Sequence, residues 1–392
     1  MYRRREFVRT GLLGAGVLTF GPAFWRSVLA APGTPGPGPY GPLGPPDGNG
    51  FRLPAGFSSR LIARGGQPVA GTGYKWHIFS DGAATFARPG GGWILVSNCE
   101  APAFVGGGAG AIRFDARGGI VDAYRILGGT NTNCAGGATP WGTWLSCEEF
   151  DRGRVWECDP RGTRAAVVRP ALGVFKHEAV AVDRHRRRVY LTEDEGDGGF
   201  YRFTPRRWRD LRRGRLDIAI VQPDGTIKWT PVPDPAALST PTRYQVPGST
   251  VFQRGEGIWY DSHTVYVATT RDNRIHAYDT RKNTIEVIYD ARAHADPPLT
   301  GVDNVTASHS GDLYVCEDNG DDELDLGLIT PDHEIARFLT ATGPGHRNSE
   351  LAGAVFNPAG SRLYLASQRY LNAGAIFEIR GPFRRQRSHR PA

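Results

Sequence analysis

A recurring pattern of strands constrains the fold of this chain more than any other feature. Each copy has an alternating apolar strand, a turn containing Asp, Pro, His or Gly, and a second strand centred on an apolar or aromatic residue. The second-strand centres lie about 50 residues apart, with one longer gap: Ile94, Trp144, Tyr190, Tyr266, Tyr314 and Tyr364. A repeat of roughly 40 to 50 residues suits blades of four strands. The six centres predict an all-β fold, a six-bladed β-propeller.

The longer gap predicts an insertion between blades 3 and 4, within residues 205–249. Inside it, Arg206–Arg213 resembles a short basic helix, and Asp224-Gly225 predicts a hairpin turn. Phe51–Ala63 is expected to supply the strand that closes the ring against the last blade, because propellers protect their edges by closure. The content of 52 glycines and a single methionine suits such a turn-rich fold.

The N-terminus has the three parts of a targeting signal in the right order. A twin-arginine pair, Arg4-Arg5, precedes a weakly apolar run, Gly11–Leu18, and a small-residue site at Ala30-Ala31. We expect residues 1–31 to be a twin-arginine signal peptide that is removed on export to the periplasm or beyond. No apolar run in the interior approaches the length of a membrane span.

The rest of the chain divides into three parts. Residues 32–50 are rich in Pro and Gly and predict a linker or a strap across the surface. Residues 51–382 are expected to form a single propeller domain, and residues 383–392 a basic, disordered tail. The net charge of +7 is concentrated in the signal segment and in this tail, so the sequence does not predict nucleic-acid binding.

The cysteine content limits the possible metal and redox chemistry. There are five cysteines and no CxxC pair, which argues against structural zinc and thioredoxin-type chemistry: Cys99, Cys134, Cys147, Cys158 and Cys316. An odd number in an exported protein leaves at least one thiol unpaired. That thiol is either buried and inert or a metal ligand.

Carboxylates recur after the second strands. They are Glu100, Glu148-Glu149, Glu193-Asp194 and Glu317-Asp318. Because strand ends open onto a face of the propeller, these acids predict a central site for hard cations, with solvated turns as the alternative. Cys134 and Glu149 are joined by a turn and a strand and could share a metal centre. The alternative is a buried thiol and a solvated acid.

Two further motifs come just before first strands, the strands expected to line the central channel. One is His177-Glu178 and the other is Arg254-Gly255-Glu256. A guanidinium beside metal-bound carboxylates suits phosphate, since Arg can bind two phosphate oxygens at once. The alternative for Arg254 with Glu256 is a surface ion pair of little consequence.

These motifs together resemble the signature of PhoX-type alkaline phosphatases. The resemblance rests on Asn133–Gly137, Thr139–Trp144, Cys147–Glu149, His177–Val180 and Arg254–Gly257, and it runs in order from about Phe51 to Pro382. It implies a monomeric, twin-arginine-exported propeller that holds a pair of ferric ions and several calcium ions on its axis. The implied reaction is hydrolysis of phosphate monoesters.

The resemblance also implies roles for individual residues. Cys134 would be a thiolate ligand to iron, and Glu149, Glu178 and Glu256 would bridge iron and calcium. Arg254 would bind the substrate phosphate, so that Arg254, Glu256 and Glu149 form the catalytic group. Further metal ligands are expected from position within the blade alone: Glu100, Asp194 and Glu317.

Two other functions remain open from the sequence. A calcium-dependent propeller hydrolase of the lactonase or gluconolactonase type would use central Asn, Asp and Glu side chains, without iron and without a role for Cys134. A propeller that serves only as a binding platform would hold structural calcium and turn over no phosphate ester.

Overall fold

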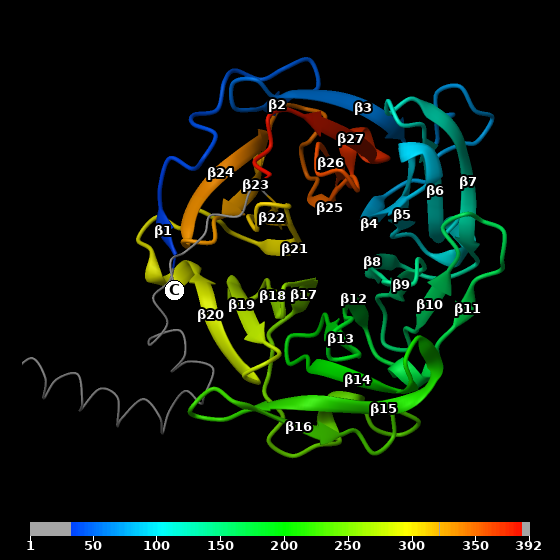
Figure 1. Cartoon of the computed structure of the whole chain (residues 1–392), viewed down its shortest axis with the longest axis vertical. Coiled ribbons are helices and arrows are strands. Elements are labelled where there is room, and N and C mark those ends of the chain that lie inside the picture. The colour runs from blue at the N-terminus through cyan, green and yellow to red at the C-terminus, as the bar shows by residue number, and fades with distance from the viewer. Residues whose placement is uncertain (1–32, 321, 386–392) are drawn as a thin grey trace, which may run out of the picture.

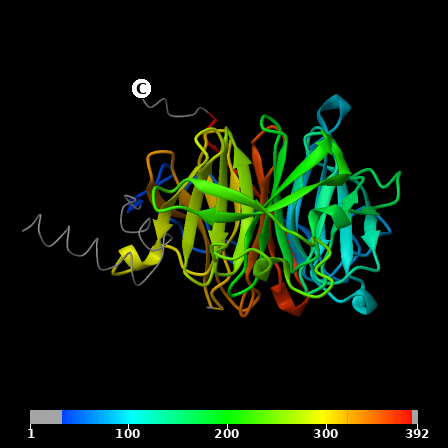
Figure 2. The ribbon, with the colours of Figure 1, turned by 90° about the horizontal axis from the view of Figure 1, so that it is seen from below.

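The computed structural model describes residues 33–320 and 322–385, which form six antiparallel sheets arranged as blades around a central axis (Figure 1). Seen from its edge, the molecule is a disc with strands running across its thickness (Figure 2). The described residues contain strands and short 3₁₀ turns but no α-helix, which confirms the prediction of a six-bladed, all-β propeller. The signal peptide predicted for residues 1–31 lies outside the described residues.

Each blade is built on four strands ordered from the axis outwards, which follow one another in the chain in all blades but the last. The inner strands are β4 (Ser80–Ala87), β8 (Asn133–Ala138), β12 (His177–Asp183), β17 (Gly255–Asp261), β21 (Val302–Ala307) and β25 (Leu351–Phe356). The second strands are β5 (Trp93–Cys99), β9 (Trp144–Glu148), β13 (Arg188–Glu193), β18 (Thr264–Thr269), β22 (Leu313–Glu317) and β26 (Arg362–Ser367).

The outer half of each blade completes the sheet. The third strands are β6 (Gly108–Phe114), β10 (Val155–Cys158), β14 (Phe200–Arg207), β19 (Arg274–Asp279), β23 (Leu324–Ile329) and β27 (Ala375–Arg380). The fourth strands are β7 (Ile120–Gly128), β11 (Val167–Val168), β15 (Asp210–Val221), β20 (Thr284–Asp290), β24 (Glu334–Ala341) and β3 (Ser58–Arg64). The 3₁₀ turns are Pro89–Gly91, Ala103–Val105, Pro170–Leu172, Thr242–Tyr244, Ala291–Ala293 and Tyr370–Asn372. None of the helical turns in the described part of the chain has the length and hydrophobicity needed to cross a bilayer.

The core is divided into wedges between neighbouring blades. Apolar side chains from adjacent sheets form one buried cluster at each of the six junctions. Five of the six second-strand centres are buried there, and Tyr190 and Tyr314 are at most 2 % exposed. The repeat therefore reflects packing between blades, because a large side chain on the second strand fills each wedge.

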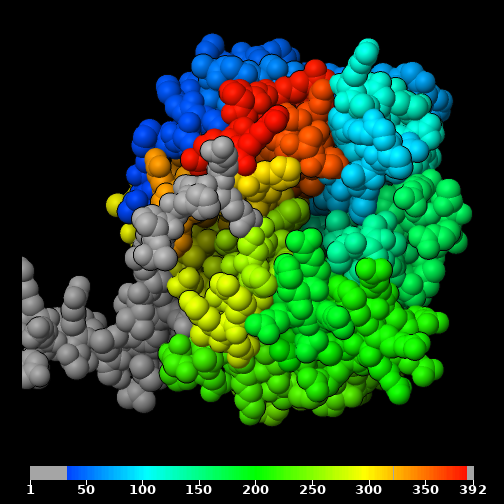
Figure 3. All heavy atoms as spheres, viewed as in Figure 1, coloured from blue at the N-terminus to red at the C-terminus, as the bar shows by residue number. Residues whose placement is uncertain are grey.

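The ring closes with a strand from each end of the chain. β3 pairs antiparallel with β27, so the last blade contains strands from both the start and the end of the propeller. In the space-filling view, the blue N-terminal and red C-terminal segments lie side by side (Figure 3). This confirms the prediction that Phe51–Ala63 supplies the closing strand.

The insertion predicted within residues 205–249 begins too early, because residues 205–221 belong to β14 and β15, the third and fourth strands of blade 3 itself. The hairpin predicted at Asp224-Gly225 joins β15 to a fifth strand, β16 (Ile227–Pro231). The helix predicted at Arg206–Arg213 is wrong. This stretch is instead the tip of the β14–β15 hairpin, whose turn lies at Trp208-Arg209, and Arg209 has a φ of 72°.

The segments that flank the propeller lie against it. β1 (Thr34–Pro35) and β2 (Phe51–Arg52) both pair with β24. Of the two forms expected for residues 32–50, a linker or a strap, the structure shows a strap across the surface. Two residues assigned to the disordered tail are ordered, contrary to the prediction. Phe383 is 6 % exposed and packs against aromatic rings of the core, and Arg384 forms an ion pair with Asp312.

Candidate metal centre

All six inner strands share one irregularity near their start. In each, the pairing with the second strand shifts at a β-bulge, where two residues oppose one. The first residue of the bulge is acidic or a thiol in blades 1 to 5 and glycine in blade 6: Asp81, Cys134, Glu178, Glu256, Asp303 and Gly353. Bulges redirect side chains, and here they bring five potential metal ligands to the same level of the axis.

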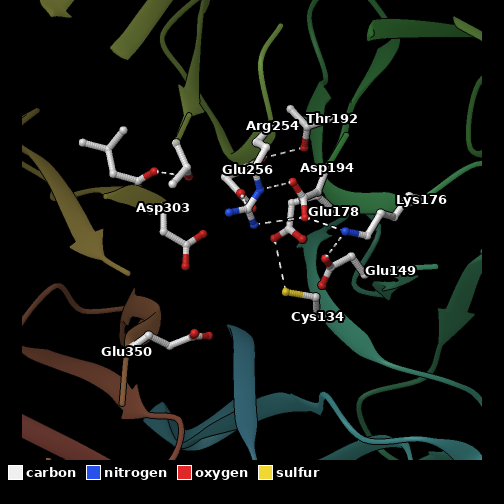
Figure 4. Close-up of polar contacts among 12 residues, drawn as sticks. Cys134, Glu149, Lys176, Glu178, Thr192, Asp194, Arg254, Glu256, Asp303 and Glu350 are labelled. Carbon is white, nitrogen blue, oxygen red and sulfur yellow. Dashed lines mark hydrogen bonds and ion pairs between the residues drawn. The ribbon is translucent and has the colours of Figure 1, made fainter. Parts of the chain in front are cut away.

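These side chains form three overlapping groups in which the ligand atoms lie within 4.8 Å of one another. The groups are Asp81–Glu100–Cys134, Cys134–Glu149–Glu178 and Glu178–Glu256–Asp303. Cys134 and Glu178 each belong to two groups, and the Cys134 Sγ lies 3.4 Å from Oε1 of Glu178 (Figure 4). The three groups therefore form one continuous cluster on the axis.

The electrostatics of the cluster favour bound cations. Burial, followed by the charge of Asp81, raises the pKa of Glu100 to about 9. Burial also raises the pKa of Glu149 to about 7, and it raises those of Glu178 and Glu256 well above their usual range. In addition, Oε2 of Glu178 is buried without a hydrogen-bond partner. Carboxylates buried this close together need cations to remain ionised, so the residues fit a metal cluster.

The chemistry of the donors limits which cations fit. Carboxylate oxygens suit hard cations such as calcium, whereas a thiolate suits softer transition metals. Burial raises the pKa of the Cys134 thiol well above its usual value, so ionisation of this thiol requires a cation beside it. The cluster is thus suited to a mixed site rather than to calcium alone.

Two basic side chains border the cluster and share one carboxylate. Arg254 Nε lies 2.6 Å from Oδ1 of Asp194, and its Nη2 lies 3.0 Å from Oε1 of Glu256. Lys176 Nζ lies 2.7 Å from Oδ2 of Asp194 and 3.0 Å from Oε1 of Glu149 (Figure 4). Burial alone would raise the pKa of Asp194, but its bonds to Arg254 and Lys176 hold that pKa below the usual range. Asp194 is therefore ionised and holds both the guanidinium of Arg254 and the ammonium of Lys176.

Most of the residues predicted from the sequence come together here. The cluster contains Glu100, Cys134, Glu149, Glu178 and Glu256, with Arg254 and Asp194 at its border. Glu317 is not among them. Its carboxylate instead accepts hydrogen bonds from the backbone amides of Thr300 and Asp325.

Three carboxylates of the site were not predicted from the sequence. Asp81 and Asp303 occupy the same bulge position as Glu178 and Glu256, so comparison of all six first strands would have identified them. Glu350 precedes β25, and Gln368 connects it to Asp81 through side-chain hydrogen bonds. Glu350 lies outside the bulge, and the bulge position of blade 6 is Gly353. A comparison of the bulge positions therefore does not point to Glu350.

Comparison with known proteins indicates the same family as the motifs. Residues 102–155 and 150–296 match the profile of a family described as alkaline phosphatase PhoX. A search of curated protein sequences gives no significant match.

Solved structures share the fold. Pseudomonas fluorescens PhoX in complex with vanadate, a transition state analogue, aligns with a TM-score of 0.73 and 17 % identity, covering 87 % of this chain and 97 % of that one. The PQQ domain of pyranose dehydrogenase from Coprinopsis cinerea aligns with a TM-score of 0.50 and 12 % identity, covering 86 % and 98 %. At these identities, the alignments establish the propeller architecture.

Proposed function

The chain belongs to the PhoX family of alkaline phosphatases and is a hydrolase of phosphate esters, and we propose that it cleaves phosphate monoesters at a metal cluster on the propeller axis. The observation that carries this proposal is the convergence of a thiol and six carboxylates in three overlapping groups on the axis. Arg254 at the border of the cluster supplies the cation that phosphate recognition requires.

We assign the metals from the resemblance to PhoX-type phosphatases, with which the donors present agree. Cys134 would hold iron as a thiolate ligand, and Glu149, Glu178 and Glu256 would hold iron and calcium through their carboxylates. Glu100 would complete the set, together with Asp81 and Asp303, which the bulges bring to the same level. Asp194, which contacts Arg254 and Lys176, serves better as their anchor than as a ligand. Glu317 is left out of the proposed ligand set.

The mechanism depends on side chains held in place before the substrate arrives. Bound cations would supply Lewis acidity that neutralises the phosphoryl oxygens and promotes ionisation of a nucleophilic water. Nη1 of Arg254, which the contacts of Nε and Nη2 with Asp194 and Glu256 leave available, would donate to the phosphoryl oxygens and stabilise the charge that develops on them. Glu256 and Asp194 hold its guanidinium from two sides, so little reorganisation is needed at the moment of reaction. Glu149 fixes the ammonium of Lys176 at the same border.

One experiment separates this function from its alternatives. Elemental analysis of the protein purified after native export should find iron and calcium. Assays on the same protein should find hydrolysis of phosphate monoesters. Calcium without iron, together with lactone hydrolysis, would support the lactonase-type alternative instead. Calcium with no turnover of any ester would support a binding platform.

Export and assembly complete the proposal. We assign residues 1–31 to a twin-arginine signal, residues 51–382 to a monomeric catalytic unit, and the mature protein to the periplasm or the extracellular space. A fusion of residues 1–31 to a folded reporter should be exported, and replacing both Arg4 and Arg5 with lysine should block export. Export of that variant would remove this part of the proposal.

A further inference from the structure

A cavity of about 210 Å³ lies directly beside the candidate metal centre. Lys176 belongs to both: it lines the cavity, and its ammonium contacts Glu149 and Asp194 of the centre. Figure 4 shows Lys176 pointing inwards towards these two carboxylates. The far wall of the cavity comes from the connection between blades 3 and 4, including Leu238 and Pro241.

The loop that carries Leu238 is held in one conformation. The side chain of Asp234 accepts hydrogen bonds from the amides of Ala236 and Leu238, at 3.0 and 2.8 Å. Arg152 Nη1 donates to the carbonyl oxygen of Ala237 at 2.6 Å, and Ala237 has a φ of 47°. A non-glycine residue in this region is strained and persists only when its surroundings enforce it. The loop is therefore a rigid support for the residue that follows.

That support presents an apolar side chain to solvent. Leu238 is 81 % exposed although its backbone is fixed on both sides. Two of the basic side chains that line the cavity are already paired: Arg152 donates to backbone carbonyl oxygens of the loop, and Arg243 pairs with Glu193 and Asp197. The carboxylates of Asp151 and Glu195 also line it. The wall is therefore mixed, and Leu238, beside Pro241, is the exposed apolar side chain in it that a ligand can contact.

We propose that this cavity binds the organic group of the phosphate ester and selects apolar groups such as a single aromatic ring. The inference rests on the proposed phosphatase function, with the phosphate held by Arg254 at the metal centre. Asp194 contacts both Arg254 and Lys176, so an ester bound by Arg254 has this cavity as its neighbour. Its volume is below the roughly 300 to 1,000 Å³ of drug-sized sites, so it suits a small group.

Two esters of opposite character test the proposal on protein purified after export with its native metals. Phenyl phosphate and glycerol 3-phosphate are each assayed with the unmodified protein, Leu238→Ser and Leu238→Met. We expect Leu238→Ser to lower kcat/KM for phenyl phosphate about tenfold, the value of a small hydrophobic contact, and to leave glycerol 3-phosphate unchanged. Leu238→Met should retain the preference. The control Leu61→Ser removes another exposed leucine, 44 % exposed on β3, and should alter neither ester.

A binding measurement distinguishes failure of this inference from failure of the proposed function. Phenylphosphonate and methylphosphonate have a carbon–phosphorus bond that phosphatases do not hydrolyse, and their affinities are measured by calorimetry. The unmodified protein should prefer phenylphosphonate, and Leu238→Ser should lose about tenfold of that preference. Equal loss of both ligands, or no change, would overturn the inference even if both esters are hydrolysed. If neither ester is hydrolysed, a preference that depends on Leu238 would still support it.

Discussion

Asp194 accepts hydrogen bonds from Arg254 with both carboxylate oxygens: Oδ1 lies 2.6 Å from Nε and Oδ2 lies 3.1 Å from Nη2. This pairing occupies one edge of the guanidinium and fixes its plane. Arg254 also has a φ of 53°, a left-handed conformation that costs energy in a residue with a side chain. The backbone and the carboxylate together hold the guanidinium at the border of the cluster.

This arrangement predicts unequal losses when either partner is changed. Arg254→Ala should lower kcat/KM for phosphate esters by about 10² to 10³, the usual cost of removing a donor to developing charge. Asp194→Asn should cost less, because the arginine remains but is held less firmly. Steady-state kinetics on protein of verified metal content provides the measurement. The control is Arg212→Ala, which removes an exposed arginine that pairs with Asp210 on the surface. If Arg254→Ala were as active as this control, the role assigned to Arg254 would be contradicted.

The position of Cys134 predicts a selective change in metal content. Cys134→Ala should lose iron and retain most of its calcium, since the carboxylates on either side remain in place. Cys147→Ala is a matched control because that thiol is also buried but lies in a hydrophobic cluster. Elemental analysis of both variants tests this directly. Iron retained in Cys134→Ala would exclude the thiolate as a ligand.

The five cysteines are all described, and all are free and buried. A thiol reagent such as Ellman's reagent should therefore react with none of them in the native protein and with five after denaturation without reductant. A reductant should leave the melting temperature unchanged. A count below five in the denatured protein would reveal a disulfide and contradict the structure.

Stability should depend on pH through His276, which lies away from the metal centre. Burial, with the charge of Arg274, lowers its pKa to about 3. The unfolded chain binds a proton near pH 6.5 that the folded protein does not, so stability is lost as pH falls from about 6.5 towards 3. Between pH 7.5 and 5 this group alone accounts for about 2 kcal/mol. In His276→Gln, the fall in unfolding free energy over that range, measured in urea, should be smaller by this amount. An unchanged fall would contradict the assignment.

The fold was predictable because the same packing arrangement between neighbouring blades recurs around the ring. A second strand must fill the wedge against its neighbour, so large residues such as Tyr190 and Tyr364 recur at a readable spacing. The tip of the β14–β15 hairpin was not predictable in the same way. Its arginines are exposed, so a run such as Arg206-Arg207 carries no pattern of burial, and the turn uses Arg209 rather than glycine in the left-handed region.

The site was only partly predictable for a different reason. Cys134, Glu178 and Glu256 lie within distinctive motifs, whereas Asp81 and Asp303 do not, although their strands bulge at the same place. A bulge depends on how two strands pair and leaves little trace in either strand alone. Glu317 shares the position after a second strand, yet its carboxylate accepts hydrogen bonds from the amides of Thr300 and Asp325 and belongs to none of the three groups.

The closure by β3 and β27 also determines when the site can be completed. Asp81 comes from the first blade, yet the amide of Gln368, which lies 2.6 Å from its Oδ2, comes from the last. Blade 6 needs a strand from the beginning of the propeller before it is whole. During synthesis, Asp81, the first of the proposed ligands to be made, therefore acquires its contact with Gln368 only after the last blade has been made. A complete metal centre would then form only in chains whose last blade has been synthesised and whose ring has closed.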